Sequence, residues 1–182
     1  DGLRLYAGIR HGLNTGLFLD QRENRRRVVE LCVGVTLCNT FAYTGAFACH
    51  ALVRGERSAL CIESSPEALA GARENFALNR VTDRAELLSG NVFDELRRLE
   101  REGTRFGLIV LDPPPFARSR TAVEAAARGY KEINLRALRL LPPGGRLATF
   151  SCSHHVSEAT FEEICRDAAT DAGVTLRIVE KL

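Results

Sequence analysis

Short apolar runs alternate with amphipathic stretches along most of the chain. The runs typical of buried strands span residues 33–37, 59–62, 85–88, 108–111, 146–150 and 174–179. Stretches with helical spacing follow residue 45 and span 65–79, 93–102, 121–141 and 157–172. This order predicts an α/β fold, in which an open and mostly parallel sheet carries helices on both faces. Ligands of such sheets bind at the carboxyl ends of the strands.

The N-terminal part does not follow this alternation. Two extended stretches, around Tyr6 and Phe18, precede the first strand–helix unit. We therefore expect residues 1–27 to form a β extension, the remnant of a preceding domain or linker, and residues 28–182 to form the α/β domain, which we expect to lack its last strand or strands. A length of 182 residues with 45% hydrophobic content supports one core.

The charge of the chain is nearly balanced. Its 25 Lys and Arg against 23 Asp and Glu leave a net charge of +2, which does not by itself indicate a nucleic-acid-binding protein. Four arginines cluster at Arg22, Arg25, Arg26 and Arg27. They could contact phosphates, and a solvated helix face explains the cluster equally well.

Six cysteines show neither paired spacing nor a secretory leader before them, so we expect reduced thiols in a cytoplasmic protein. Cys152 follows a strand, whereas the cysteines with apolar patterns, which we expect in the core, are Cys38, Cys49, Cys61 and Cys165. His154 and His155 lie next to the thiol but lack a second ligand pair, so no metal is expected. No apolar run is long enough to span a membrane.

Polar residues follow several of the predicted strands. The loop at residues 41–45 comes after the first strand, Glu63 after the second, Asn91 after the third and Asp112 after the fourth. The chain has no Gly-x-Gly-x-x-Gly turn, which argues against a nicotinamide cofactor, and no P-loop, so nucleoside triphosphate hydrolysis has no support. By itself the first loop is explained equally well by core aromatics and a turn glycine.

This layout resembles that of class I methyltransferases, whose fold is Rossmann-like and whose cofactor is S-adenosyl-L-methionine. In that layout Gly45 admits the methionine part of the cofactor, Glu63 accepts the ribose hydroxyls, and Asn91 with Val92 holds the adenine. The residues that the resemblance assigns to cofactor binding are Phe41, Tyr43, Thr44, Gly45, Glu63, Ser64, Asn91, Val92 and Asp112.

Five longer motifs, which together span most of the chain, sharpen the resemblance. They are Gly16 to Arg22, Asn39 to Phe47, Asp112 to Phe116, Arg128 to Asn134 and Phe150 to Ser153. Together they are similar to the RlmI-like family of ribosomal RNA cytosine-5 methyltransferases. Members of that family usually carry an RNA-binding domain before this part and further strands after it. Where the family commonly has lysine, this chain has Pro115, which removes a cation near the substrate.

The resemblance implies covalent chemistry on a cytosine of large-subunit ribosomal RNA. Cys152 would add to C6 as the nucleophile, and Asp112 would stabilise the charge that reaches N3 and O2. The residues assigned to substrate binding are Pro113, Pro114, Phe116, Arg22, Arg128 and Tyr130. The expected partner is RNA, with no membrane and no metal. The oligomeric state stays open, with a homodimer as one alternative.

Two other functions remain open from the sequence. A purine nitrogen methyltransferase also uses an Asp-Pro-Pro-aromatic corner, although Pro115 stands before Phe116 here and nitrogen attack needs no thiol. An inactive RNA-binding module would retain the fold without turnover. The sequence does not identify the base that removes the C5 proton.

Overall fold

A computed structural model describes residues 2–7, 16–30, 34–117 and 119–181. The helices are α1 (Arg22–Glu30), α2 (Ala46–Arg54), α3 (Pro66–Leu78), α4 (Val92–Arg101), α5 (Val123–Leu140) and α6 (Glu158–Ala172). The strands are β1 (Thr36–Thr40), β2 (Ser58–Glu63), β3 (Ala85–Ser89), β4 (Leu108–Leu111) and β5 (Arg146–Thr149). Short 3-10 helices at Thr82–Arg84 and Arg120–Ala122 precede β3 and α5.

The five strands form one parallel sheet in the order β3-β2-β1-β4-β5. This confirms the predicted α/β class. β1 lies at the centre, where Cys38 is opposite Leu60 of β2 and Ile109 of β4. The sequence placed this strand at 33–37, of which residue 33 lies outside the described residues; the strand runs to Thr40 because its polar end is buried and paired. The Thr40 hydroxyl donates to the Val110 carbonyl oxygen at 2.9 Å.

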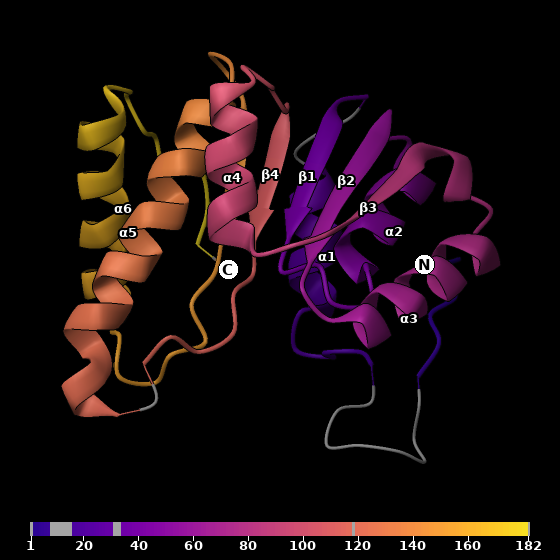
Figure 1. The fold of residues 1–182 in the computed structure, drawn as a ribbon, viewed down its shortest axis with the longest axis horizontal. Helices are drawn as coiled ribbons and strands as arrows, with labels where there is room; N and C mark the ends of the chain where they lie inside the picture. The colour runs from indigo at the N-terminus through magenta and orange to yellow at the C-terminus, as the bar shows by residue number, and fades with distance from the viewer. Residues whose placement is uncertain (1, 8–15, 31–33, 118, 182) are drawn as a thin grey trace.

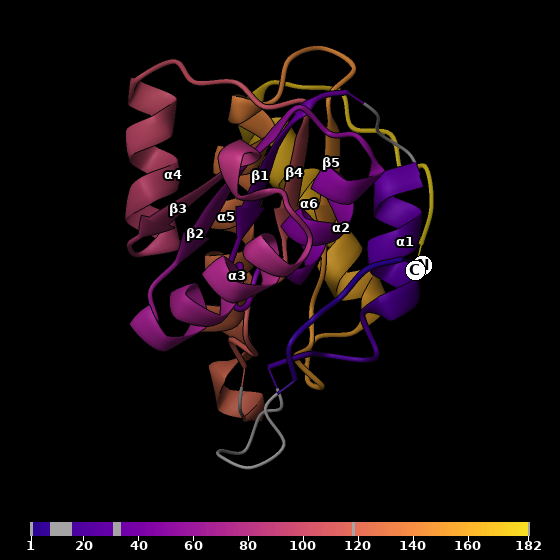
Figure 2. The same ribbon diagram turned by 90° about the vertical axis from the view of Figure 1, so that its right-hand side faces the viewer.

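Helices cover both faces of the sheet (Figure 1). One face packs against α1, α2 and α3 in a core that includes Val28, Phe47 and Phe76. The other face packs against α4, α5 and α6, with Leu96 and Ile133 in its core. In Figure 2, α4 and α1 lie on opposite sides of the strands. The buried apolar residues of each strand therefore contact helices on both sides, as the continuous apolar runs predict.

Local sequence signals set most helix ends. Ser65, Asn91 and Ser157 are N-caps whose side chains accept backbone N–H groups of α3, α4 and α6, at 3.2, 2.9 and 3.1 Å. Gly55 and Gly173 end α2 and α6 with positive φ angles of 111° and 69°. These caps explain why the predicted bounds of the helices after β2 agree with the structure within about two residues.

The β extension predicted for residues 1–27 is wrong for the described residues of that range. Residues 2–7 and 16–21 form no strand, and α1 begins at Arg22 and continues past residue 27. Residues 2–7 are held instead by side chains of α3 and its C-cap: the Arg4 N–H donates to Asn79 Oδ1 at 3.0 Å and the Tyr6 N–H to Asn75 Oδ1 at 2.7 Å. Side-chain amides thus satisfy backbone groups that a neighbouring strand would otherwise pair.

The strand predicted at 174–179 is also not formed. Val174, Ile178 and Val179 are each more than 40% exposed, and within the described residues β5 pairs only with β4. The segment is held by side chains, since Arg27 Nε lies 2.7 Å from Glu180 Oε2. An alternating pattern gives a strand only where a partner strand takes up its backbone groups. None of the described helices has the length and apolar character needed to cross a membrane.

Candidate active site

The carboxyl ends of β1, β4 and β5 lie next to one another because these strands are neighbours in the sheet. The order of the strands reverses between β1 and β4, and open parallel sheets bind their ligands at such a point. A small cavity of about 60 Å³ lies there, lined by residues of α1, of the loop after β1 and of the end of β4. Its lining includes Phe41, Tyr43, Thr44 and Asp112, which the sequence assigned to the cofactor.

The loop after β1 has an unusual backbone. Phe41 and Tyr43 have φ angles of 50° and 48°, which non-glycine residues rarely adopt, and Gly45 has 71°. A Cβ on Gly45 would lie 2.7 Å from the ring of Phe76, so the helix packing itself requires glycine here. Thr44 is buried, and its hydroxyl donates to the Gly16 carbonyl oxygen at 2.6 Å. These constraints set the loop before any ligand binds.

Glu63, at the end of β2, is tied into this loop. Its Oε2 accepts the Tyr43 N–H at 2.9 Å, and its Oε1 accepts the N–H groups of Ser64 and Ser65 at 2.8 and 2.9 Å. A carboxylate oxygen has two lone pairs, so Oε2 retains acceptor capacity for a ligand. Glu63 therefore fixes the shape of the β1 loop and can still accept a hydroxyl hydrogen.

The residues predicted to hold adenine lie at the start of α4. Asn91 is exposed, and its Oδ1 accepts the Phe93 N–H at 2.9 Å as the helix cap. Val92 is only 4% exposed and belongs to the core between the sheet and α4 and α5. The geometry leaves the Asn91 side chain accessible at the strand ends, whereas most of the Val92 surface is already covered.

Asp112 directly follows β4 and lies next to the start of α1. Gln21 Nε2 donates to Asp112 Oδ1 at 3.1 Å. Burial and the negative charge of Asp20 raise the pKa of Asp112 to about 6, against the opposing effects of Arg25 and Gln21. A proton is therefore held on this carboxyl much closer to neutral pH than on an ordinary aspartate.

Sequence reasoning missed the role of Arg25 and Gln21. Arg25 was grouped with solvated or phosphate-binding arginines, but it is only 4% exposed and its Nη1 donates to the Phe18 carbonyl oxygen at 2.9 Å. The signal was present in the chain: Arg25 shares one helix face with Val28 and Val29, which are also buried. The other members of the cluster, Arg22, Arg26 and Arg27, are exposed.

The cavity next to Arg25 fits an anionic group. Arg25 and Asn39 both line it, and both are at least 96% buried. Asn39 Nδ2 makes no hydrogen bond to another described residue. The amide lies near Cys61 and acts on the pKa of that thiol in the direction opposite to burial. A guanidinium and an unpaired amide N–H are donors suited to a carboxylate, such as that of the methionine part of the cofactor.

Cys152 is the exposed cysteine among the five described, whereas Cys38, Cys49, Cys61 and Cys165 are buried. Its thiol donates to the Pro113 carbonyl oxygen at 3.4 Å, which places it against the Asp112–Pro113 corner. Partial burial and the negative charges of Asp112 and Asp20 raise the pKa of the Cys152 thiol. Burial raises the pKa of Cys49, Cys61 and Cys165 to about 12, so these thiols stay protonated.

The structure corrects the role predicted for Tyr130. This side chain is 0% exposed and therefore does not contact a substrate. Its ring packs between Phe116 and Phe161, at centroid distances of 4.7 and 5.3 Å, and its hydroxyl bonds to Ser151 and Ser153. Helical spacing along α5 places Tyr130 on the same buried face as Ala126, Ile133 and Ala137.

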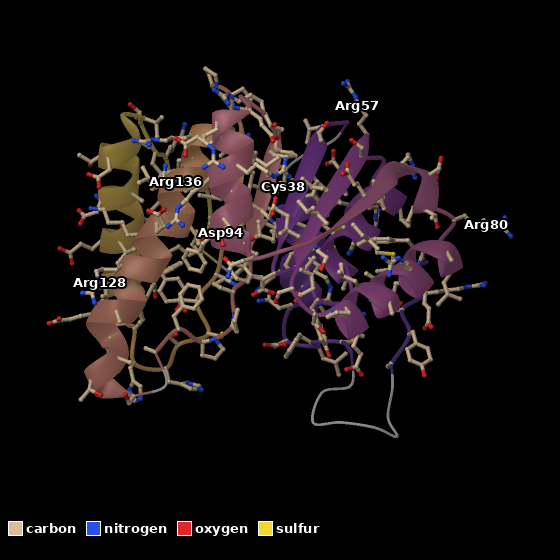
Figure 3. All side chains as sticks on the ribbon, viewed as in Figure 1. Cys38, Arg57, Arg80, Asp94, Arg128 and Arg136 are labelled. Atoms are coloured by element: carbon tan, nitrogen blue, oxygen red, sulfur yellow. The ribbon has the colours of Figure 1, made fainter. Side chains whose placement is uncertain are left out.

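The other residues assigned to substrate binding divide into two groups. Pro113 is buried at the corner, Pro114 is exposed, and Phe116 is partly buried with Phe41 and Phe93 around its ring. Arg22 lies exposed at the start of α1, near the strand ends. Arg128 does not join them, since Figure 3 shows its side chain on the outer side of α5, directed away from the sheet. Arg128 lies on the face of α5 opposite the buried face that carries Tyr130, which explains this position.

The histidines beside the thiol are exposed. Within the described residues, no group of three or more His, Cys, Asp or Glu side chains has the arrangement of a metal site.

The fold and this site define a class of enzyme. The family model for S-adenosylmethionine-dependent methyltransferases matches residues 1–182. The chain therefore belongs to this family, and its cofactor is S-adenosyl-L-methionine. The predicted fold class, cofactor and family resemblance are confirmed.

Curated relatives are named ribosomal RNA large subunit methyltransferase I. The protein of Aeromonas hydrophila subsp. hydrophila is 41% identical over 182 residues, which are 100% of this chain and 46% of that protein. The protein of Cronobacter sakazakii is 41% identical over 184 residues, with 99% of this chain and 46% of that protein covered. The chain thus spans less than half the length of these relatives.

Solved structures share the fold. A Streptococcus mutans methyltransferase has a TM-score of 0.82 at 23% identity, covering 92% of this chain and 44% of that one. Trm5b of Pyrococcus abyssi has a TM-score of 0.70 at 18% identity, covering 99% of this chain and 48% of that one. At these identities the likeness concerns the fold alone.

Proposed function

We propose that this chain methylates carbon 5 of a cytosine in large-subunit ribosomal RNA, through a transient bond between the Cys152 sulfur and C6 of the base. The observation that carries the proposal is the position of the exposed thiol, 3.4 Å from the Pro113 carbonyl oxygen at the Asp112 corner. Relatives at about 40% identity, which are named for the large-subunit RNA, support the choice of substrate.

Cys152 would activate the base. Carbon 5 of cytosine is a poor nucleophile, and addition of a thiolate at C6 forms an S–C6 bond and moves the C5–C6 π electrons toward N3 and O2. Those electrons then make C5 nucleophilic. After C5 takes the methyl group, loss of the C5 proton to a base re-forms the C5–C6 double bond and expels the thiolate. The identity of that base stays open.

Asp112 would hold the proton that stabilises the intermediate. The negative charge that reaches N3 and O2 is stabilised most by a donor already in place, and a carboxyl with a pKa of about 6 can carry that proton near neutral pH. Gln21 holds one carboxyl oxygen at 3.1 Å. The second oxygen is the one we assign to the base.

The cofactor supplies the methyl group on a sulfonium. We assign its methionine carboxylate to Arg25 and Asn39, and its ribose and adenine to Glu63 and Asn91. Arg25 and Asn39 provide buried donors at one end, and the partly buried Glu63 and the exposed Asn91 provide acceptors at the other. The cavity between Arg25 and Asp112 brings the methionine end next to the corner where we expect the base.

The base must leave its stack to reach this corner, so we expect a single-stranded or flipped cytosine. Pro113, Pro114 and Phe116 form the rigid wall that we assign to it, and Arg22 remains a proposed phosphate contact. A cytoplasmic location and the oligomeric state stay predictions.

The test is to incubate the protein with methyl-labelled cofactor and unmodified large-subunit RNA, and to identify the labelled nucleoside. We expect 5-methylcytidine, and we expect Cys152→Ala to reduce its formation at least about 1,000-fold, as loss of a covalent nucleophile does. The matched control is Cys165→Ala, whose thiol is buried in the core; it should retain turnover.

A second readout detects the covalent bond itself. RNA with 5-fluorocytosine at the target cannot lose a proton from C5, so a Cys152-dependent adduct should survive denaturing electrophoresis. Labelled methylguanosine or methyladenosine would instead support the purine nitrogen methyltransferase. Absence of cofactor binding in calorimetry would support the inactive RNA-binding module. Full methylation by Cys152→Ala would disprove the thiol mechanism.

A further inference from the structure

A buried hydrogen-bond cluster joins the two loops that meet at the candidate site. The Ser151 hydroxyl donates to the Tyr130 hydroxyl at 3.1 Å. The Tyr130 and Ser153 hydroxyls form a second hydrogen bond at 2.9 Å, in which either can be the donor. Ser153 Oγ also accepts the Ala117 N–H at 3.2 Å. Tyr130 is 0% exposed, Ser153 3% and Ala117 4%, so water does not compete for the two bonds made by Ser153.

Two members of this cluster flank the proposed nucleophile in the sequence. Ser151 and Ser153 are the two neighbours of Cys152, and Ala117 lies at the far end of the loop that begins at Asp112. Tyr130 belongs to α5 and is held by its ring contacts with Phe116 and Phe161. The Tyr130 hydroxyl thus binds both flanks of the thiol, and Ser153 links them to Ala117 in the loop that begins at Asp112.

We propose that Tyr130 is a positioning residue, whose hydroxyl holds the Cys152 loop against the Asp112 corner so that the thiol reaches the ring of the base. The inference rests on the proposed function for the identity of the reacting thiol. The hydrogen bond from the Cys152 thiol to the Pro113 carbonyl oxygen joins the same two loops. Its length therefore depends on how the cluster positions one loop relative to the other. A reacting atom displaced by about 1 Å can cost about 100-fold in rate.

Tyr130→Phe is the informative change because it keeps the ring and removes only the hydroxyl. Without it, Ser151 and Ser153 lose their shared partner and the Cys152 loop moves more freely toward water. Partial burial and the nearby Asp112 raise the pKa of Cys152, so a looser loop should bring that pKa closer to its ordinary value. Reaction with a small alkylating reagent should then become faster at neutral pH while methylation becomes slower.

The experiment measures both quantities on the whole protein. For Tyr130→Phe we expect kcat for RNA methylation to fall about 10- to 100-fold with the KM for the cofactor changed less than about twofold. Iodoacetamide labelling of Cys152, followed by peptide mass spectrometry, should have its midpoint at lower pH. Ser153→Ala should give the same pair of changes, and the double variant should lose less than the product of the two single effects. Tyr6→Phe, at an exposed tyrosine, is the matched control and should change neither.

Two results would overturn the inference. One is an unchanged kcat together with an unchanged labelling midpoint in Tyr130→Phe. The other is labelling that spreads to Cys38, Cys49 and Cys61, which would show that the hydroxyl only maintains the fold. The labelling needs no turnover, so it tests the positioning role separately: methylation retained by Cys152→Ala would remove the proposed chemistry while the labelling comparison still stood.

Discussion

Two charged regions of the molecule differ in how their charges are satisfied. Along the contact between α4 and α5, Arg136 lies 2.7 Å from Glu100 and 3.0 Å from Glu132, and Arg139 lies 3.1 Å from Glu100. Burial alone would raise the pKa of Glu100, but Arg136 and Arg139 together hold it below 4.5. Figure 3 shows Arg136 at this contact between the two helices.

At the strand ends the balance is reversed. Among the described residues, the Gln21 side chain donates a hydrogen bond to Asp112, and burial with Asp20 outweighs the effects of Arg25 and Gln21, so the pKa of Asp112 rises to about 6. Paired charges at the helix contact favour folding, whereas Asp112 is held where its ionised form is disfavoured. A desolvated carboxyl with so few donors is common where a site uses its proton, which supports the proposed role of Asp112 as a proton donor.

Among the changes that test this comparison, Asp112→Asn should have the largest effect, because it removes the proposed proton donor. Methylation should fall about 100- to 1,000-fold, as for removal of a donor to a developing charge. The same substitution should raise the free energy of unfolding at neutral and alkaline pH. Because the folded pKa is raised from 3.8 to about 6, the wild type loses stability as the pH rises through this range, by up to about 3 kcal/mol.

Chemical denaturation at pH 4 and pH 8, with kcat measured in parallel, checks both parts. The Asn variant should be more stable than the wild type at pH 8 and similar to it at pH 4. Unchanged turnover, or equal stability of the two proteins at pH 8, would place Asp112 among the structural charges.

A smaller effect is expected for Arg25→Lys. A lysine cannot present the forked N–H groups of a guanidinium to a carboxylate, so the Kd for S-adenosylhomocysteine should rise about tenfold in calorimetry. Arg136→Lys is the matched change at the helix contact and should leave this Kd unaltered. Equal Kd values for both variants would show that Arg25 does not face the cofactor.

The smallest effect is that of Glu100→Gln. Loss of its two arginine partners should lower the free energy of unfolding by about 1 kcal/mol, since solvent screens a network that is partly exposed. Because the folded pKa is depressed, this stabilisation is present above pH 4.5 and is lost as the pH falls through the folded pKa.

Methylation should be unaffected by Glu100→Gln. The control is Glu102→Gln, at an exposed ion pair with Arg98, for which no measurable change in stability is expected. A loss of turnover in Glu100→Gln would remove the distinction between the two regions.

Several predictions from the sequence depended on local signals and were confirmed. The helical ranges 65–79 and 157–172 agree with α3 and α6 within about one residue, and the apolar run 108–111 is buried whichever element covers it. The strands predicted around Tyr6 and at 174–179 were wrong because a strand needs a partner elsewhere in the chain. Asn75 and Asn79 provide the contacts to residues 2–7 instead, and no local pattern shows this.

The candidate site shows the same division. Its strand-end positions at Glu63, Asp112 and Cys152 follow from the order of elements, because parallel strands bring their carboxyl ends to one edge. The predicted contact of Tyr130 with substrate was wrong, and Arg25 was missed, although helical spacing groups each of them with apolar neighbours. Such spacing shows that residues share a face, but only the folded chain shows which element covers that face.

The sequence by itself determined the α/β order, the family and the residue types at the strand ends, because these depend on periodicity and on short motifs. Only the tertiary structure decided the environment of each group. Burial and Asp20 raise the pKa of Asp112, and Arg25 comes from a helix far away in sequence. The Tyr130 hydroxyl of α5 holds Ser151 and Ser153, and Ser153 binds Ala117 of the loop after Asp112. Desolvation and hydrogen bonding depend on distances between residues far apart in the chain, such as Gln21 and Asp112, and these distances exist only in the folded chain.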